Sequence, residues 1–118
     1  MKTHKDLDVW QKSIELVTKL YEITGTYPSH EIYGMVSQIR RASVSIPTNI
    51  AEGAARNHRK EFIQFIGISM GSASELETLL LISSKLKYLS LESYKKMSLE
   101  LESIMRMLTN LQRALSRI

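Results

Sequence analysis

The residues best suited to chemistry in this chain are five cations near its middle. Between Gln38 and Lys60 there is a single anion, Glu52, so this segment accounts for the whole formal net charge of +4. Cations gathered on one surface bind phosphate groups and other anions. The alternative is a solvated face with structural arginines. The five cations are Arg40, Arg41, Arg56, Arg59 and Lys60.

The spacing along the sequence predicts different roles for these cations. Glu52 and Arg56 are four residues apart, so on a helix they can form an ion pair. For Arg59 and Lys60 we favour contact with an anion. Arg40 and Arg41 fit either role, because both ion pairing across helices or subunits and phosphate contact are open to them.

No pattern for catalysis or metal binding accompanies the basic segment. His4, His30 and His58 lie far apart without ligand spacing, and the chain has no cysteine. The Glu-x-x-His motif of di-iron bundles and the glycine-rich phosphate loop are both absent. Glu75 and Glu77 are two residues apart, so a helix would point them in different directions. We therefore expect no catalytic residue, no metal site, no cofactor and no enzyme activity.

Apolar residues recur at helical spacing along most of the chain. This periodicity predicts four helices, over about residues 6–24, 31–55, 58–86 and 91–116. Ser29 and Ser90 are expected N-caps of the second and fourth helices. On the first helix, Trp10 and Tyr21 are expected to belong to the core. The connections are short, and four such helices pack most simply as an up-down-up-down bundle.

The second predicted helix contains a proline. The apolar pattern keeps its phase through Pro47, which favours one kinked helix over two helices with a short connector. A proline inside a helix costs roughly 3 kcal/mol in isolation, so packing must compensate for it. The Asn49 side chain is expected to bond the backbone that Pro47 leaves without a donor.

The third predicted helix carries small residues at Gly67, Gly71, Ser74 and Thr78. A glycine inside a helix costs roughly 1 kcal/mol relative to alanine, so two of them indicate a close approach of another backbone. A tight crossing within the chain is the first interpretation, and a seam between subunits is the second.

Length and composition are those of a single soluble domain over residues 1–118. The chain is 43% hydrophobic and 24% charged, which is typical of a folded globular protein. We find no apolar run of the roughly 20 residues that a membrane span needs and no secretory leader. The lack of cysteine fits a reducing compartment. The sequence therefore predicts a cytoplasmic protein with no membrane partner.

Three stretches resemble the family of four-helix-bundle proteins encoded by intervening sequences in 23S ribosomal RNA genes. They are DLDVWQKS at 6–13, SQIRRASVSIPTNIAEGAAR at 37–56 and KEFIQFIGISMGSASELET at 60–78. A weaker similarity continues through YLSLESY before the fourth helix, so the resemblance covers almost the whole chain. The S-Q-I-R-R string with S-I-P-x-N-I-A-E-G is long and specific.

The resemblance implies a left-handed four-helix bundle that assembles as a ring, typically a homopentamer. It also implies a relation to the accessory bundle protein of diversity-generating retroelements, which works with a reverse transcriptase and nucleic acid. The expected function is therefore a non-enzymatic homo-oligomer that binds RNA or DNA through residues 40–60, with a protein partner also open. The alternative is a structural or protein-binding scaffold with no nucleic-acid role. Under either function, Pro47, Asn49, Glu52, Gly67 and Gly71 are expected to serve the bundle or its subunit contacts.

Overall fold

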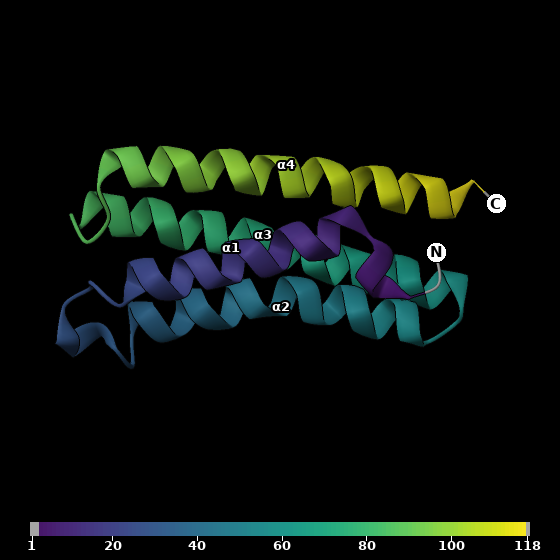
Figure 1. Cartoon of the computed structure of the whole chain (residues 1–118), viewed down its shortest axis with the longest axis horizontal. Helices are drawn as coiled ribbons and strands as arrows, with labels where there is room; N and C mark the ends of the chain where they lie inside the picture. Colours follow the sequence, from purple (N-terminus) through teal and green to yellow (C-terminus); the bar gives the residue numbers. More distant parts are fainter. Residues whose placement is uncertain (1–2, 118) are drawn as a thin grey trace.

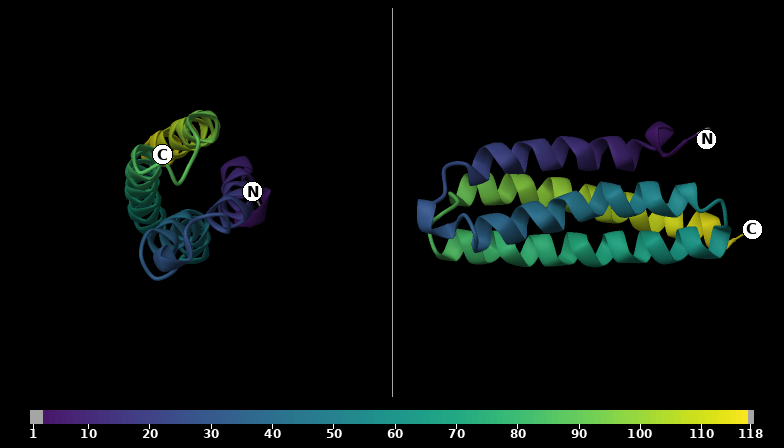
Figure 2. Two further views of the ribbon diagram at one scale, coloured as in Figure 1. Left: turned by 90° about the vertical axis from the view of Figure 1, so that its left-hand side faces the viewer. Right: turned by 90° about the horizontal axis from the view of Figure 1, so that it is seen from below.

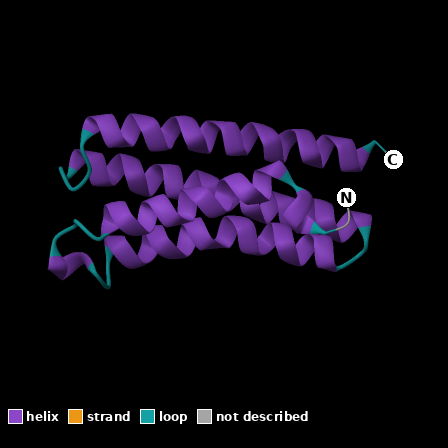
Figure 3. Ribbon diagram, viewed as in Figure 1, coloured by secondary structure: helices purple, strands orange, loops and turns teal. Residues whose placement is uncertain are grey.

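Four long helices alternate in direction along one axis. The computed structural model describes residues 3–117. The helices are α1 (Asp8–Thr24), α2 (Met35–Ala55), α3 (Arg59–Lys85) and α4 (Leu91–Ser116), with 3-10 turns η1 (His4–Asp6) and η2 (Ser29–Glu31). The part of the chain that the structure describes contains helices and loops but no strand (Figure 3). α1 begins and α4 ends at the same end of the bundle (Figure 1), so the predicted all-α, up-down-up-down bundle is confirmed.

The helices follow chain order around the bundle axis, as the end-on view of Figure 2 shows. The molecule measures 46 × 23 × 19 Å. The contact between α2 and α3 is the most extensive and that between α1 and α4 the least. A small number of polar links join α1 to α4. Lys19 Nζ lies 2.5 Å from the Glu100 carboxylate. Hydrogen bonding to Glu100 and its charge raise the pKa of the Lys19 ammonium.

Two predicted helix starts differ from the structure. The second helix begins at Met35 rather than near residue 31, because residues 29–31 form the separate turn η2. Ser29 is therefore not its N-cap. The Glu31 carboxylate instead accepts a hydrogen bond from the Met35 amide at 3.1 Å. α1 begins at Asp8 rather than residue 6, since η1 occupies His4–Asp6. Ser90 does cap α4, accepting from the Ser93 amide at 3.1 Å.

The core is a continuous column of aliphatic side chains from all four helices. Its fully buried members lie at the helical spacing that the sequence shows, and they are Leu16, Leu20, Ile39, Ile46, Ile50, Ile66, Leu76, Leu80, Ile104 and Leu108. Tyr21 does not belong to this column, although the sequence placed it there. Its side chain is 43% exposed. Trp10 is half-buried and packs against the edge of the core.

α2 runs without interruption through Pro47, as predicted for a single helix (Figure 1). Pro47 is buried, so packing of its ring offsets part of the lost backbone bond. Asn49 does not reach the Ser43 carbonyl that Pro47 leaves unpaired. Its amide donates instead to the Ser45 carbonyl at 2.8 Å and to Ser45 Oγ at 2.9 Å. Residues four apart on a helix lie directly above one another, which places Asn49 over Ser45.

α2 and α3 approach closely at a glycine, but not at the predicted ones. A Cβ on the buried Gly53 would lie 2.6 Å from Phe65 Cβ, so only glycine fits. The tight crossing expected at Gly67 and Gly71 does not occur within residues 3–117. A Cβ on Gly67 would meet only the end of the Gln112 side chain, at 3.6 Å, and one on Gly71 would have no atom within 4 Å. The small residues of α3 therefore face outward.

α3 is also more apolar than its burial requires. Over its most apolar 18-residue window the mean hydropathy is 1.3, which by length and composition alone is enough to cross a membrane. No apolar run of this length was expected from the sequence. The core helix of a soluble protein passes the same test, although only 33% of this window is buried inside the bundle.

Candidate nucleic-acid interface

The five cations do not form one patch. Arg40 and Arg41 lie on α2 near the end of α1, whereas Arg56, Arg59 and Lys60 surround the turn from α2 into α3. From Arg41 to Arg56 the helix rises about 22 Å at 1.5 Å per residue. The fold therefore divides the basic segment into two separate sites.

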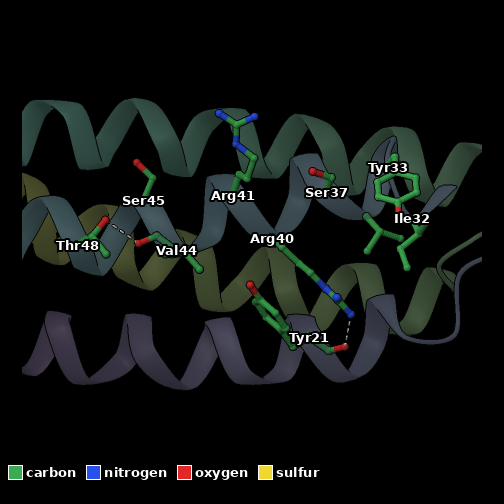
Figure 4. A pocket seen from close by; sticks show the side chains of 10 residues that line it. Tyr21, Ile32, Tyr33, Ser37, Arg40, Arg41, Val44, Ser45 and Thr48 are labelled. Carbon is green, nitrogen blue, oxygen red and sulfur yellow. Dashed lines mark hydrogen bonds between the residues drawn. The ribbon is translucent and has the colours of Figure 1, made fainter.

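Arg40 is held inside the chain. Its Nε donates to Thr24 Oγ1 at 3.0 Å, and its Nη2 donates to the Tyr21 carbonyl at 3.2 Å. The guanidinium also lies over the Tyr21 ring, 4.4 Å from the centroid. A cation beside the carbonyls that end a helix is electrostatically favourable. Arg40 therefore joins the end of α1 to α2, as Figure 4 shows.

Arg41 points to the other side of α2 (Figure 4) and is exposed. Among the described residues it has no hydrogen bond or ion pair. It lines a groove of about 600 Å³ between α1 and α2. It also lines a smaller hollow of about 330 Å³ that includes Ser72 and Glu75 of α3. The structure therefore distinguishes the two arginines. Arg40 makes structural contacts within the chain, and Arg41 remains free to contact an anion.

Arg56 makes its contacts within the chain. Its guanidinium lies 3.1 Å from the Glu52 carboxylate and 3.6 Å from that of Glu61, and it sits over the Phe65 ring at 5.2 Å. The predicted Glu52–Arg56 pair is therefore present. Two acidic partners fix the side chain at the turn and neutralise its charge locally.

Arg59 and Lys60 are the first two residues of α3, and both are exposed. Neither has an ion-pair partner within residues 3–117. His58 caps the helix, although its Nδ1 accepts from the Glu61 amide at a long 3.5 Å. The start of a helix carries a partial positive charge, which the Arg59 and Lys60 side chains reinforce. An anion at this position would be attracted to the helix N-terminus and to both side chains.

Over the described residues no group of three or more His, Cys, Asp or Glu side chains could hold a metal ion. A carboxylate at the other end of the bundle accepts two hydrogen bonds. Hydrogen bonds from the Met35 amide and from the Tyr88 hydroxyl lower the pKa of the Glu31 carboxyl. This carboxylate ties the start of α2 to the loop before α4.

Sequence reasoning missed the groove between α1 and α2. Its aromatic members, Tyr21 and Tyr33, come beside Arg40 and Arg41, although they lie outside the basic segment of the sequence. The groove could have been predicted from a second apolar stripe on α1, at Trp10, Ile14, Val17 and Tyr21. These residues repeat in steps of four, three and four beside the buried stripe, so α1 is apolar on two faces.

Comparisons with known proteins agree with this fold. The family model described as "23S rRNA-intervening sequence protein" matches residues 5–110. A crystal structure of a protein of unknown function from the S23 ribosomal protein family of Bacteroides thetaiotaomicron superposes with a TM-score of 0.82. It is 24% identical to this chain, and the match covers 89% of this chain and 95% of that one. No curated protein matches the sequence.

Proposed function

The chain belongs to the 23S rRNA-intervening sequence protein family, and on that premise we propose that it is a non-enzymatic, homo-oligomeric protein that binds nucleic acid. RNA and DNA are both candidate ligands. The assembly has five copies, as the family resemblance implies, and acts in the cytoplasm. No cofactor is required.

The observation that carries this proposal is the exposed pair Arg59 and Lys60 at the start of α3. Two cations without intrachain partners, beside the backbone N–H groups of a first helical turn, form a favourable environment for a phosphate. Arg41 adds a third free cation, which forms a second site about 22 Å or more away along the bundle. That spacing suits contact with more than one phosphate of an extended backbone.

Assembly would strengthen the weak binding of a single copy. Repeating two cationic sites around a ring raises the effective concentration of the second contact after the first has formed. Each neutralised phosphate also releases counterions, so affinity should fall steeply as salt rises.

A scaffold without a nucleic-acid role is the second candidate. It is favoured by the engagement of Arg40 with Tyr21 and Thr24, and of Arg56 with Glu52 and Glu61. Two of the five cations are thus already used within the chain. In this case Arg41, Arg59 and Lys60 would contact a protein partner or a neighbouring subunit.

The deciding experiment measures binding of nuclease-treated protein to labelled structured RNA and to duplex DNA at two salt concentrations. Light scattering on the same sample gives the mass. We expect binding by an oligomer that weakens with salt and is lost in Arg59→Glu/Lys60→Glu without change in mass. A matched control is Lys95→Glu/Lys96→Glu, which reverses two exposed cations on α4. An intact oligomer that binds neither ligand at low salt would replace this proposal with the scaffold.

A further inference from the structure

The second half of α4 carries arginines that are not apparent from the overall charge balance. Outside residues 38–60 positive and negative charges balance as a whole, but residues 103–118 contain three arginines and no acidic residue. All three are exposed, and they are Arg106, Arg113 and Arg117. Arg117 keeps helical backbone angles as the C-cap of α4. Steps of seven and four residues place the three side chains within about 40° of one another, so they form one arginine stripe.

The arginine stripe faces solvent on the side of α4 opposite the core. Arg106 follows the buried Ile104 by two residues, which turns it about 200° from the core-facing side. A hollow of about 450 Å³ follows the stripe, and its lining residues are Glu102, Met105, Arg106, Thr109, Asn110 and Arg113. A hydroxyl and a carboxamide therefore lie between two guanidinium groups. Side chains of these types hydrogen-bond to phosphate and sugar oxygens in nucleic-acid complexes.

Contacts within the chain do not account for the arginine stripe. The ion pairs among residues 3–117 all involve other side chains. Glu102 lies four residues before Arg106, yet the two form no ion pair there. Arg113 and Arg117 are also four apart, and like charges at that spacing destabilise a helix. The negative end of the α4 dipole favours a cation in the last turn only, so it does not explain Arg106.

The arginine stripe ends at the level of Arg59 and Lys60. α3 begins and α4 ends at the same end of the bundle (Figure 1). The two helices are antiparallel, and Gln112 Nε2 donates to the Ile63 carbonyl at 3.4 Å. Counting back along α3 and forward along α4 from this bond puts Arg59 level with residues 116–117. Unpaired cations therefore continue from the start of α3 along about 17 Å of α4.

We propose that the arginine stripe binds the phosphate backbone of the same nucleic acid that contacts Arg59 and Lys60. This inference rests on the proposed function and adds a second contact surface to it. Guanidinium groups match phosphate oxygens in charge and in geometry. One strand of B-DNA carries a phosphate every 3.4 Å along the axis, so the stripe spans about five phosphates. Phosphate contacts carry no sequence information, so the stripe positions the ligand without selecting a sequence.

Substitution of the arginine stripe tests this inference. The variant Arg106→Gln/Arg113→Gln/Arg117→Gln changes exposed side chains only, so circular dichroism and light scattering should show the wild-type fold and mass. Each phosphate contact with duplex DNA contributes about 0.9 to the slope of log K against log salt. For one engaged subunit, a rise from about 50 to 200 mM salt should therefore weaken wild-type binding about 40-fold more than binding by the variant. Fluorescence anisotropy measures both affinities.

A matched control removes the same charge near the opposite end of the bundle. The control is Lys85→Gln/Lys95→Gln/Lys96→Gln, all at exposed positions, and it should keep the wild-type salt slope. Equal losses in the two triple variants would attribute the effect to net charge and overturn the inference. A stripe variant with the wild-type slope, beside an Arg59→Glu/Lys60→Glu variant that no longer binds, would overturn the inference and leave the proposed function standing. A wild-type protein that binds no nucleic acid would overturn both.

Thiol protection distinguishes direct contact from a long-range effect of charge. The natural chain has no cysteine, so Asn110→Cys places a single exposed thiol between Arg106 and Arg113. Added RNA or duplex DNA should slow its reaction with maleimide, whereas the exposed thiol of Thr78→Cys on α3 should react at an unchanged rate. Equal rates at Asn110→Cys with and without nucleic acid would overturn the inference. A thiol at this position that does not react even in the ligand-free oligomer would show that another subunit covers the stripe, and would overturn it too.

Discussion

Arg40 closes the end of α1 by stacking on Tyr21. Its guanidinium lies 4.4 Å from the Tyr21 ring centroid and donates to the carbonyl of the same residue at 3.2 Å. The last turn of α1 has no basic residue of its own. Arg40, sixteen positions beyond Thr24, therefore supplies the positive charge that the end of this helix favours.

Arg40→Ala should destabilise the fold by about 1–2 kcal/mol, because it removes two hydrogen bonds and one cation–π contact. Urea unfolding followed by circular dichroism measures the change. Arg41→Ala is the matched control. The Arg41 side chain is exposed and has no hydrogen-bond or ion-pair partner within residues 3–117, so its removal should shift stability by less than about 0.5 kcal/mol. Equal effects from both substitutions would contradict the structural role of Arg40.

Alanine substitutions at Gly53 and Gly71 should change the stability of the fold in opposite directions. In Gly53→Ala the new methyl group meets Phe65 at 2.6 Å, which forces α2 and α3 apart at a cost of about 1–3 kcal/mol. Gly71→Ala has open space and gains helix propensity, so stability of the subunit should rise by up to about 1 kcal/mol. Thermal unfolding of both variants at one protein concentration checks the pair. Destabilisation by both would show that the open face of α3 is covered.

The Glu31 carboxylate should make stability depend on acid. Its pKa is lowered from an ordinary 4.5 by the Met35 amide and then by the Tyr88 hydroxyl. A carboxyl with a lowered folded-state pKa stabilises the fold above its unfolded-state value, and this contribution is lost as pH falls through the folded-state pKa. The free energy of unfolding should therefore decrease as pH falls below about 4.5.

Glu31→Gln should flatten that part of the acid dependence, since glutamine does not titrate. Tyr88→Phe is the matched variant. It keeps the ring beside Tyr27, whose centroid lies 5.5 Å away, but removes the hydroxyl that donates to Glu31. It should flatten the dependence by a smaller amount. Chemical unfolding at a series of pH values would contradict this account if both variants kept the wild-type slope.

The salt dependence of nucleic-acid binding should reflect the number of free cations that contact phosphates. Removing one phosphate contact lowers the slope of log K against log salt by about 1 per subunit engaged. Arg59→Ala and Lys60→Ala should each reduce the slope, while Arg40→Ala, whose side chain is held on Tyr21, should leave it unchanged. Fluorescence anisotropy titrations across a salt series measure this. A reduced slope for Arg40→Ala would place its guanidinium on the ligand.

The sequence by itself determined the number of helices, their order and most of their core. Ile39, Ile46 and Ile50 recur at helical spacing, and all three are fully buried. The apolar periodicity also predicted that α2 continues through Pro47. These features follow from local geometry, because 3.6 residues per turn places apolar side chains on one face whatever lies opposite.

The tertiary structure decided which residues meet across helices. Spacing along one helix could predict the Glu52–Arg56 pair, but it could not place Arg40 on Tyr21, nineteen residues away. It also could not show that Gly53 faces Phe65 while Gly71 faces open space. Such contacts depend on the rotation of each helix about its axis and on its distance from its neighbours. Those quantities are set by the packing of the whole core, and no short stretch of sequence contains them.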